Sequence, residues 1–428
     1  MPDKPQVVLW APAPALVQYC GVSLLERHLR VLQRLGFRQA IVISPDPEVI
    51  GVVDAPPSWA RREIKTESRR IPERNLSFGR LGEAVRGDGP VLVVPADIYC
   101  DARLLDALTG AMQTTALIDS SPPGDLAPLL SNGAIRYSGA ALLEPAFVRE
   151  NPSEADVAEA VRRDARGLVD AATEPDYVSS MRRHLRPVWF PAPTPENRAC
   201  AERLILDSAK KYPALIHSPA QTAIVRLICR TSITPTGVTW FAFVLGWGVT
   251  WAFATGWLWS ATLTALFIGI LDGVDGRLAR VKVETTQFGT WEHWLDYAYE
   301  ISWWLALGYY FFWTGLLPWG PALAFVLIGT ELLDCRFRRG IRQRTGRPPD
   351  DVAPIDRAFR CIAARRNIFL WMFVLGLIAD RPAEAFVAMC VWQMITILYV
   401  VVRWFVICIC GFYPGALDGN AEALGRNT

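Results

Sequence analysis

Acidic side chains recur at helical spacing in one apolar part of the chain, ILDGVDGRLARVKVETTQFGTWEHWLDYAYE. Asp272 and Asp275 are three residues apart, so on a helix both carboxylates face the same side. Glu292, Asp296 and Glu300 follow at intervals of four and form a second acidic face. Carboxylates at membrane depth are costly unless they are paired or bind metal, so they are functional candidates. Their convergence without enough cations favours Mg²⁺ (or Mn²⁺), with phosphate supplying the remaining oxygen ligands.

Small residues follow the first acidic pair along the same expected helix. Gly273, Gly276 and Ala279 carry little or no side chain. Their spacing opens a slot in which a nucleotide could lie close to the helix backbone. The alternative for this region is purely structural: the acids could form ion pairs with nearby cations, namely Arg277, Arg280 and Lys282.

This segment resembles the CDP-alcohol phosphotransferase family, whose pattern is D-x2-D-G-x2-A-R-x8-G-x3-D-x3-D. The matching positions are Asp272, Asp275, Gly276, Ala279, Arg280 and Gly289. The pattern then departs, because only two residues separate Gly289 from Glu292, and three more precede Asp296. Placing His293 at the third acidic position would keep the first spacing but would put Tyr297 at the fourth, where no carboxylate base would remain. We therefore prefer Glu292 and Asp296, which keep the i, i+4 pair.

The resemblance implies a membrane enzyme that moves a phosphoalcohol group from a CDP-alcohol to a second alcohol and releases CMP. Metal held by Asp272, Asp275, Glu292 and Asp296 would stabilise charge on the pyrophosphate and on the leaving CMP. Asp296 would also accept the proton of the attacking hydroxyl. The CDP moiety would contact Gly273, Gly276, Ala279, Arg280 and Gly289. His293 would orient an acid or the acceptor, or would be structural.

Composition divides the 428-residue chain into a polar first half and an apolar second half, with a net charge of +2 that gives no reason to expect nucleic acid. We expect a cytoplasmic domain at 1–150, a helical linker at 151–218, a membrane domain at 219–415 and a tail at 416–428. The chain opens without a signal peptide. Its nine cysteines lack zinc-site spacing and are interpreted as reduced thiols.

Short apolar runs at residues 7–9, 40–43 and 90–95 alternate with amphipathic helical segments in the first 150 residues. Continuous apolar strands between helices predict a Rossmann-like α/β domain with a parallel sheet. The phrases GVSLLERHLRVLQRLGFRQAIVIS and VLVVPADIYCDARLL resemble nucleotidyltransferase domains, in which Asp97 would bind metal. Asp97 could instead cap the next helix.

The phosphate-binding loop of such domains is missing. After the first strand the chain reads APAPALVQYC, with prolines in place of glycines and no Lys or Arg. Proline lacks the N–H donor with which such a loop binds phosphate. We expect a degenerate, non-catalytic domain, with a divergent active domain as the alternative, so the CDP-alcohol would come from another enzyme.

Apolar runs near 238–256, 257–272, 297–315, 318–333, 367–379 and 383–402 predict six membrane spans. Arginines and lysines cluster in alternate connections, ten arginines lying between Arg336 and Arg366. This bias predicts a multi-pass protein of the cell (inner) membrane with both termini in the cytoplasm. The segment SPAQTAIVRLICRTSITPTG is expected to lie along the membrane interface.

The pairing of the two halves resembles the bifunctional inositol-phosphate cytidylyltransferase/di-myo-inositol-phosphate-phosphate synthase family. It implies an inositol phosphate acceptor, and a lipid acceptor remains equally open. Candidate acceptor-binding residues are Arg336, Arg338, Arg339, Arg365, Arg366 and Asn367. Positive-inside topology and anionic lipid headgroups also explain such a loop. Homodimers are common in the resembled family.

Two other classes of function remain open. In the first, both domains are degenerate and the chain is a membrane scaffold that binds CDP-alcohols without turning them over. In the second, the intramembrane acids mark the ion path of a transporter. The chain shows no convincing inverted repeat, and the intact first half of the acidic motif favours catalysis over a scaffold.

Overall fold

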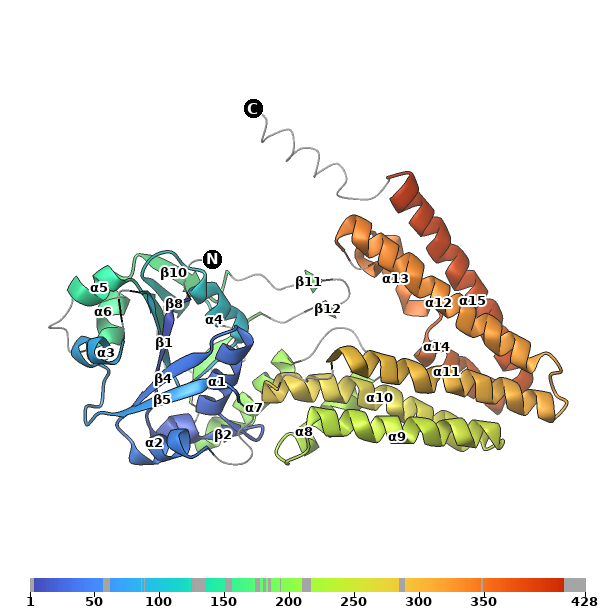
Figure 1. The fold of residues 1–428 in the computed structure, drawn as a ribbon, viewed down its shortest axis with the longest axis horizontal. Helices are drawn as coiled ribbons and strands as arrows, with labels where there is room; N and C mark the ends of the chain where they lie inside the picture. Colours follow the sequence, from blue (N-terminus) through green and yellow to red (C-terminus); the bar gives the residue numbers. More distant parts are fainter. Residues whose placement is uncertain are drawn as a thin grey trace.

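The computed structural model describes most of the chain. The described residues are 4–56, 62–85, 87, 89–122, 124, 126, 136–150, 156–173, 178–179, 182–183, 186–192, 194–209, 217–284, 289–347 and 349–411; the side chains of 178–179, 182–183, 289–293 and 351 lie outside the description. Figure 1 shows an α/β domain at one end and long helices at the other.

The α/β domain is built on a seven-stranded sheet with the order β10-β8-β9-β6-β1-β4-β5. Its strands are β1 (Gln6–Trp10), β4 (Gln39–Ser44), β5 (Lys65–Arg70), β6 (Val91–Pro95), β8 (Thr115–Asp119), β9 (Arg136–Leu143) and β10 (Gly167–Asp170). The predicted α/β class is confirmed. Most neighbours are parallel, but β9 runs antiparallel to both β6 and β8. An antiparallel neighbour needs no helical crossover from the strand before it.

Both faces of the sheet are covered, as the continuous apolar strands predicted. Val7 and Leu9 of β1 join one core cluster, whereas Val8 between them joins another on the opposite face. The covering helices are α1 (Leu24–Arg34), α2 (Pro47–Asp54), α3 (Phe78–Ala84), α4 (Ala102–Thr109), α5 (Pro145–Glu150) and α6 (Val157–Asp164).

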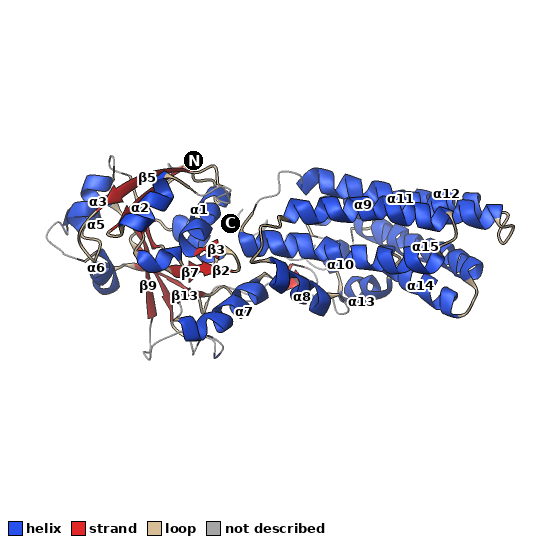
Figure 2. Cartoon of the chain, turned by 90° about the horizontal axis from the view of Figure 1, so that it is seen from below, coloured by secondary structure: helices blue, strands red, loops and turns tan. Residues whose placement is uncertain are grey.

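The sheet domain extends beyond residue 150 into the segment that we expected to be linker. Strand β10 belongs to the main sheet, and β13 (Trp189–Pro191) pairs with β7 (Ile98–Cys100). Short strands β2 (Gln18–Tyr19) and β3 (Val22–Ser23) form a hairpin, and β11 (Val178–Ser179) pairs with β12 (Arg182–Arg183). Near the end of the predicted linker lie the 3-10 turn Pro195–Asn197 and α7 (Arg198–Ser208), and α8 (Ser218–Ile228) follows where the membrane domain was expected to begin. Figure 2 shows α7 and α8 leading from the sheet toward the long helices.

The second half of the chain is helical. Its elements are α9 (Pro235–Ala254), α10 (Leu258–Lys282), α11 (Gly289–Trp313), α12 (Gly320–Thr345), α13 (Pro354–Ile362), α14 (Arg366–Ile378) and α15 (Pro382–Trp404), which continues as a π-helical turn to Ile409. Aromatic side chains such as Trp303, Trp304 and Phe311 fill the buried core between these helices.

The predicted number of six spans is not confirmed. Among the described residues, α9, α10 and α15 with its π turn are long and apolar enough to cross a membrane. Helices α13 and α14, which meet at an angle of 41°, are together long and apolar enough if they form one span interrupted by a bend. Helices α11 and α12 lie where two of the six spans were expected, but the charged C-terminal part of α12, from Asp334 to Arg344, lowers its mean hydropathy.

Candidate active site

The two aspartates of the first motif half lie in the C-terminal part of α10, next to α9. Thr239 of α9 donates a hydrogen bond from Oγ1 to Oδ2 of Asp275 at 2.9 Å, and the Gly276 N–H donates to Oδ1. Thr239 is buried, so its hydroxyl fixes one rotamer of the Asp275 carboxylate. Asp275 is therefore positioned by two donors before any ligand binds.

A single arginine at the start of α14 joins the acids of α10 to those of α11. Arg366 Nη2 lies 2.9 Å from Asp272 Oδ2, and Nη1 lies 3.9 Å from Glu300 Oε2. The Asp272 side chain remains 47% exposed, whereas Arg366 and Glu300 are 13% and 11% exposed. Arg366 thus neutralises a buried acid and at the same time contacts an accessible one.

The same arginine reaches Asp296 through a hydroxyl. Arg366 Nη1 donates to the Tyr299 hydroxyl at 3.3 Å, and that hydroxyl donates to Asp296 Oδ1 at 2.8 Å. Tyr299 is fully buried and its ring packs on Trp303. Helices α10, α11 and α14 therefore bring Asp272, Asp296 and Arg366 into one polar cluster.

The small residues of α10 let neighbouring groups lie close to the helix backbone, and side chains of the protein itself occupy that space. A Cβ atom at Gly273 would lie 2.0 Å from Nε2 of Gln221, so the Gln221 amide of α8 rests on the helix backbone there. At Gly276 the nearest such atom is Nη1 of Arg280, at 3.4 Å. Arg280 Nε donates to the Ala209 carbonyl at 2.9 Å.

The structural ion-pair explanation fails for Arg277. Its guanidinium is buried and hydrogen-bonds to Ser218 and Thr222 of α8. Lys282 donates to the carbonyls of Thr231 and Ile233. These contacts fasten the end of α10 to α8 and to the α8–α9 connection.

The rest of the expected metal ligands cannot be placed. The side chain of the predicted ligand Glu292 lies outside the described residues, as does that of His293, and nothing is described around Gly289 beyond its place in α11. Among the side chains that the structure does describe, His, Cys, Asp and Glu form no group of three that could hold a metal. The contacts between Arg366 and the acids account for much of the charge balance in this part of the site.

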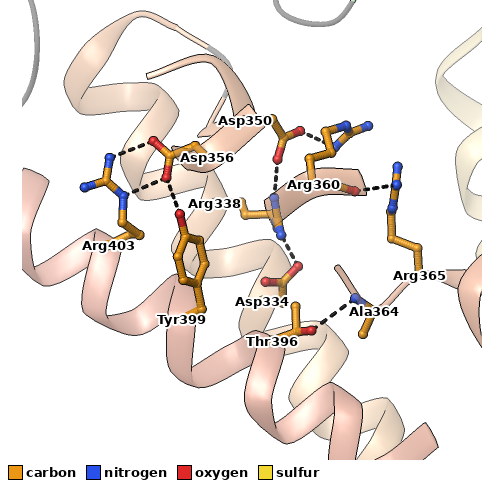
Figure 3. A network of polar contacts seen from close by, with 10 residues as sticks. All are labelled: Asp334, Arg338, Asp350, Asp356, Arg360, Ala364, Arg365, Thr396, Tyr399 and Arg403. Carbon is orange, nitrogen blue, oxygen red and sulfur yellow. Dashed lines mark hydrogen bonds and ion pairs between the residues drawn. The ribbon is translucent and has the colours of Figure 1, made fainter. Parts of the chain in front are cut away.

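The arginine-rich connection between α12 and α14 contains a polar network (Figure 3). Arg338 pairs with both Asp334 and Asp350 at 2.6 Å, and Asp350 also pairs with Arg360. The Arg365 guanidinium donates to the Arg360 carbonyl at 2.6 Å. This network holds the connection against the end of α12.

A second set of contacts in the same region fastens α13 to α15. Arg403 forms a two-bond pair with Asp356, whose Oδ1 also accepts from the Tyr399 hydroxyl. A small cavity beside these residues is enclosed by Phe359 and Val400 among others.

Of the six residues predicted to bind the acceptor, Arg338 and Arg366 are thus engaged with acids. Arg336, Arg339, Arg365 and Asn367 are exposed.

The expected phosphate loop of the sheet domain forms a 3-10 turn, Ala13–Leu16. The N–H groups of Ala11, Ala15 and Val17 donate to the carbonyls of Ile43, Pro12 and Pro14, and two residues of the loop are prolines without an N–H. Burial raises the pKa of the nearby Asp97 carboxyl. Helix α4 is capped by Asp101 instead of Asp97, so the capping explanation for Asp97 is wrong.

Sequence reasoning missed three contributors to the site. Thr239 hydrogen-bonds to Asp275, Tyr299 hydrogen-bonds to Asp296, and Gln221 covers Gly273. Hydroxyl and amide side chains on apolar helices carry no spacing signal that singles them out. Arg366 was noticed for a different role; as the first residue of an apolar helix facing acidic helices, it could have been identified as their counter-ion.

The fold and site define a helical domain with apolar helices long enough to cross a membrane and with a cluster of carboxylates, joined to an α/β domain. Residues 232–378 match the family model described as CDP-alcohol phosphatidyltransferase. The chain therefore contains a CDP-alcohol phosphatidyltransferase domain and is an enzyme of the phosphotransferase class.

Solved structures resemble each half separately. Phosphatidylinositol phosphate synthase (PgsA1) of Mycobacterium tuberculosis with CDP-DAG bound is 17% identical, covering 48% of this chain and 98% of its own, with a TM-score of 0.35. The inositol-1-phosphate CTP transferase of T. maritima is 8% identical; the match covers 50% of this chain and 100% of that chain, with a TM-score of 0.35. UDP-glucose pyrophosphorylase of Acinetobacter baumanii is 11% identical (52% and 99%, TM-score 0.34). No curated protein matches the chain.

Proposed function

We propose that this protein transfers a phosphoalcohol group from a CDP-alcohol to an acceptor alcohol and releases CMP. The observation that carries the proposal is the cluster of Asp272 and Asp296 around Arg366, with Asp275 three residues from Asp272 on α10, within the segment that matches the family. A purely structural cluster would leave no acid accessible, yet Asp272 is half-exposed.

The donor would bind along the small residues of α10. Gly273 and Gly276 let a ligand reach the backbone, and Gln221 marks the depth of that approach because its amide already makes it. A nucleotide would displace the Gln221 amide or hydrogen-bond to it. Arg280, directed back toward Gly276, would face a phosphate of the donor.

The described donor atoms fit a hard divalent ion. Carboxylate oxygens are the ligands that Mg²⁺ or Mn²⁺ prefers, and the exposed Asp272 is held by a single cation. In this proposal Asp272, Asp275, Glu292 and Asp296 would hold the ion. When bound, it would neutralise the pyrophosphate of the donor. Arg366 would then turn from Asp272 toward Glu300.

Asp296 would take the proton of the attacking hydroxyl. The hydrogen bond that it accepts from Tyr299 would orient its carboxylate toward the acceptor. Tyr299 fixes that orientation through its own contact with Arg366.

The acceptor would be an inositol phosphate or a lipid alcohol. Its negative charge would be met by the exposed Arg336 and Arg339 and by Arg365, whose guanidinium bonds only a carbonyl in the network, with Asn367 as a further exposed contact; Arg338 is engaged with two acids. We also propose that the helical domain crosses the cell membrane, that the α/β domain lies in the cytoplasm, and that the protein dimerises.

The test is exchange in the reverse direction. Purified protein with Mg²⁺ would be given labelled CMP and either phospholipid or inositol phosphate extracts, and formation of labelled CDP-alcohol would be followed. We expect metal-dependent exchange that Asp296→Asn abolishes and Asp380→Asn, a change to an exposed acid in the α14–α15 connection, leaves intact. CDP-alcohol binding without exchange in any extract would support the scaffold instead.

A further inference from the structure

The C-terminus of α10 is in contact with the α/β domain. The last carbonyls of a helix have no intrahelical donors and must find partners elsewhere. Two of these carbonyls, those of Arg280 and Ala279, accept hydrogen bonds from the backbone N–H groups of Val283 and Glu284. The next carbonyls, of Val281 and Lys282, accept hydrogen bonds from a different domain.

Two arginines of α1 supply these bonds, and a third donates to the carbonyl of Glu284, just beyond the helix. Arg27 Nη1 donates to Val281 O at 2.7 Å, Arg30 Nη1 to Lys282 O at 2.8 Å, and Arg34 Nη2 to Glu284 O at 3.0 Å. Positions 27, 30 and 34 lie on one face of a helix, so α1 presents a row of cations to the negative end of the α10 dipole.

The two inner cations are buried. Arg27 and Arg30 are each 3% exposed. Glu26 pairs with both Arg30 and Arg62, and Arg30 also reaches Glu284 at 3.3 Å. A buried cation is stable only when it is paired and hydrogen-bonded, so this arrangement resists separation of the domains.

Other contacts hold the same junction. Val283 ends α10 in the left-handed region (φ 52°), unfavourable for a β-branched residue, and its side chain joins the apolar core of the α/β domain. On the other side of the junction, a Cβ atom at Gly21 would lie 2.3 Å from the Cys229 carbonyl. Gly21 has a φ of 78°, so glycine is required there for two reasons.

We propose that the α/β domain acts as a holder for the catalytic helix, in which Arg27, Arg30 and Arg34 are positioning residues that set the place of Asp272 and Asp275. Asp275 lies six residues before Val281, about 9 Å along a helix axis. A shift at the held end therefore moves the carboxylates. The effect on catalysis rests on the proposed function. The inference also assigns a structural role to a domain in whose phosphate loop the N–H groups are bonded to carbonyls or replaced by proline.

The test compares four variants of the full chain in detergent with Mg²⁺. Arg27→Met/Arg30→Met removes the buried donors, Arg34→Met removes the exposed one, and Arg34→Lys keeps a charged donor there. Arg80→Met is the control: Arg80 lies on α3, within the α/β domain, and pairs with Glu73. For each, calorimetry gives the dissociation constant of CDP and the number of sites, and CMP release gives kcat.

In the double variant we expect the dissociation constant of CDP to rise and kcat per folded site to fall, each about tenfold. In Arg34→Met we expect the same two changes at about threefold, and Arg34→Lys should restore most of that loss. Misfolding alone would lower the number of sites without changing the dissociation constant. An unchanged dissociation constant and kcat in both methionine variants would overturn the proposal.

Hydrogen exchange separates this inference from the proposed function. Amides of residues 276–284 should exchange faster in the double variant than in Arg80→Met, whether or not the protein turns over a CDP-alcohol. If the wild type neither binds CDP nor releases CMP, the proposed function fails while faster exchange still supports the holder. Equal exchange in the double variant and the control would show that α1 does not hold α10.

Discussion

The chain contains two regions that resemble nucleotide-binding sites, and they differ in what surrounds the aspartate. At the edge of the sheet, Asp97 is half-buried beside a loop whose N–H groups are bonded to neighbouring carbonyls or replaced by proline. At the end of α10, Asp272 is accessible and is paired with Arg366. The two aspartates differ in their surroundings and not in residue type, so the groups around an acid are more informative than the acid.

The largest expected effect is the contrast between an acid of α10, Asp275, and the acid at the sheet edge, Asp97. Asp275→Asn should lower exchange of CMP by about a thousandfold, because it removes charge from the site of phosphate transfer. Asp97→Asn should change the rate less than twofold. The measurement is the initial rate of labelled CDP-alcohol formation at saturating CMP.

The opposite outcome would reverse the assignment of the two regions. A large loss with Asp97→Asn and a small one with Asp275→Asn would mean that the sheet edge still binds nucleotide. Equal melting temperatures of the two variants would exclude a folding defect as the cause.

Removing the shared cation should produce the next largest effect. Arg366→Met leaves Glu300 buried without its ion pair and frees Asp272, so we expect a loss of about 3 kcal/mol in stability and of most activity. Denaturant unfolding followed by tryptophan fluorescence measures the first, and CMP exchange the second. Arg366→Met/Glu300→Gln should recover stability without recovering activity. Recovery of both would show that Arg366 is only a structural counter-ion.

Sequence patterns predicted the α/β class, the acid-bearing helices and the loss of the phosphate loop, because each depends on local residue types. Proline in the loop and the spacing of Asp272 and Asp275 are visible without a structure. The partners of those acids are not, because Thr239 and Arg366 come from two other helices, α9 and α14. Hydrogen bonds between helices depend on packing, which no single segment encodes.

The two regions should also differ in their response to pH. Burial lowers the pKa of His28, in α1, to about 4 from its ordinary 6.5, and its Nε2 contacts the Ile98 carbonyl at 2.8 Å. Because the folded pKa lies below the unfolded one, the neutral imidazole contributes stability that is complete above about pH 6.5 and is lost as pH falls toward 4. The loss amounts to about 3 kcal/mol. Hydrogen exchange of α1 amides between pH 7 and 4.5, corrected for the intrinsic rate, measures it.

His28→Gln is the matched variant, since its amide can still donate to Ile98 but does not titrate. Protection of α1 in this variant should be nearly independent of pH over the same range. A pH dependence as steep as that of the wild type would show that another group causes the loss. Amides of α9, far from His28, serve as the internal control.

The smallest effect is expected where the arginine-rich connection meets the acceptor. Arg339→Gln removes an exposed charge and should raise the KM for a phosphorylated acceptor about threefold with little change in kcat, because a solvated cation contributes little to binding. Arg338→Gln instead breaks the pairs with Asp334 and Asp350, and should lower the melting temperature without changing the KM per folded enzyme. Steady-state kinetics at several ionic strengths separate the two, since only the Arg339 effect should fade with salt. An equal rise in KM for both variants would mean that the internal network, like the holder at α10, positions a substrate site.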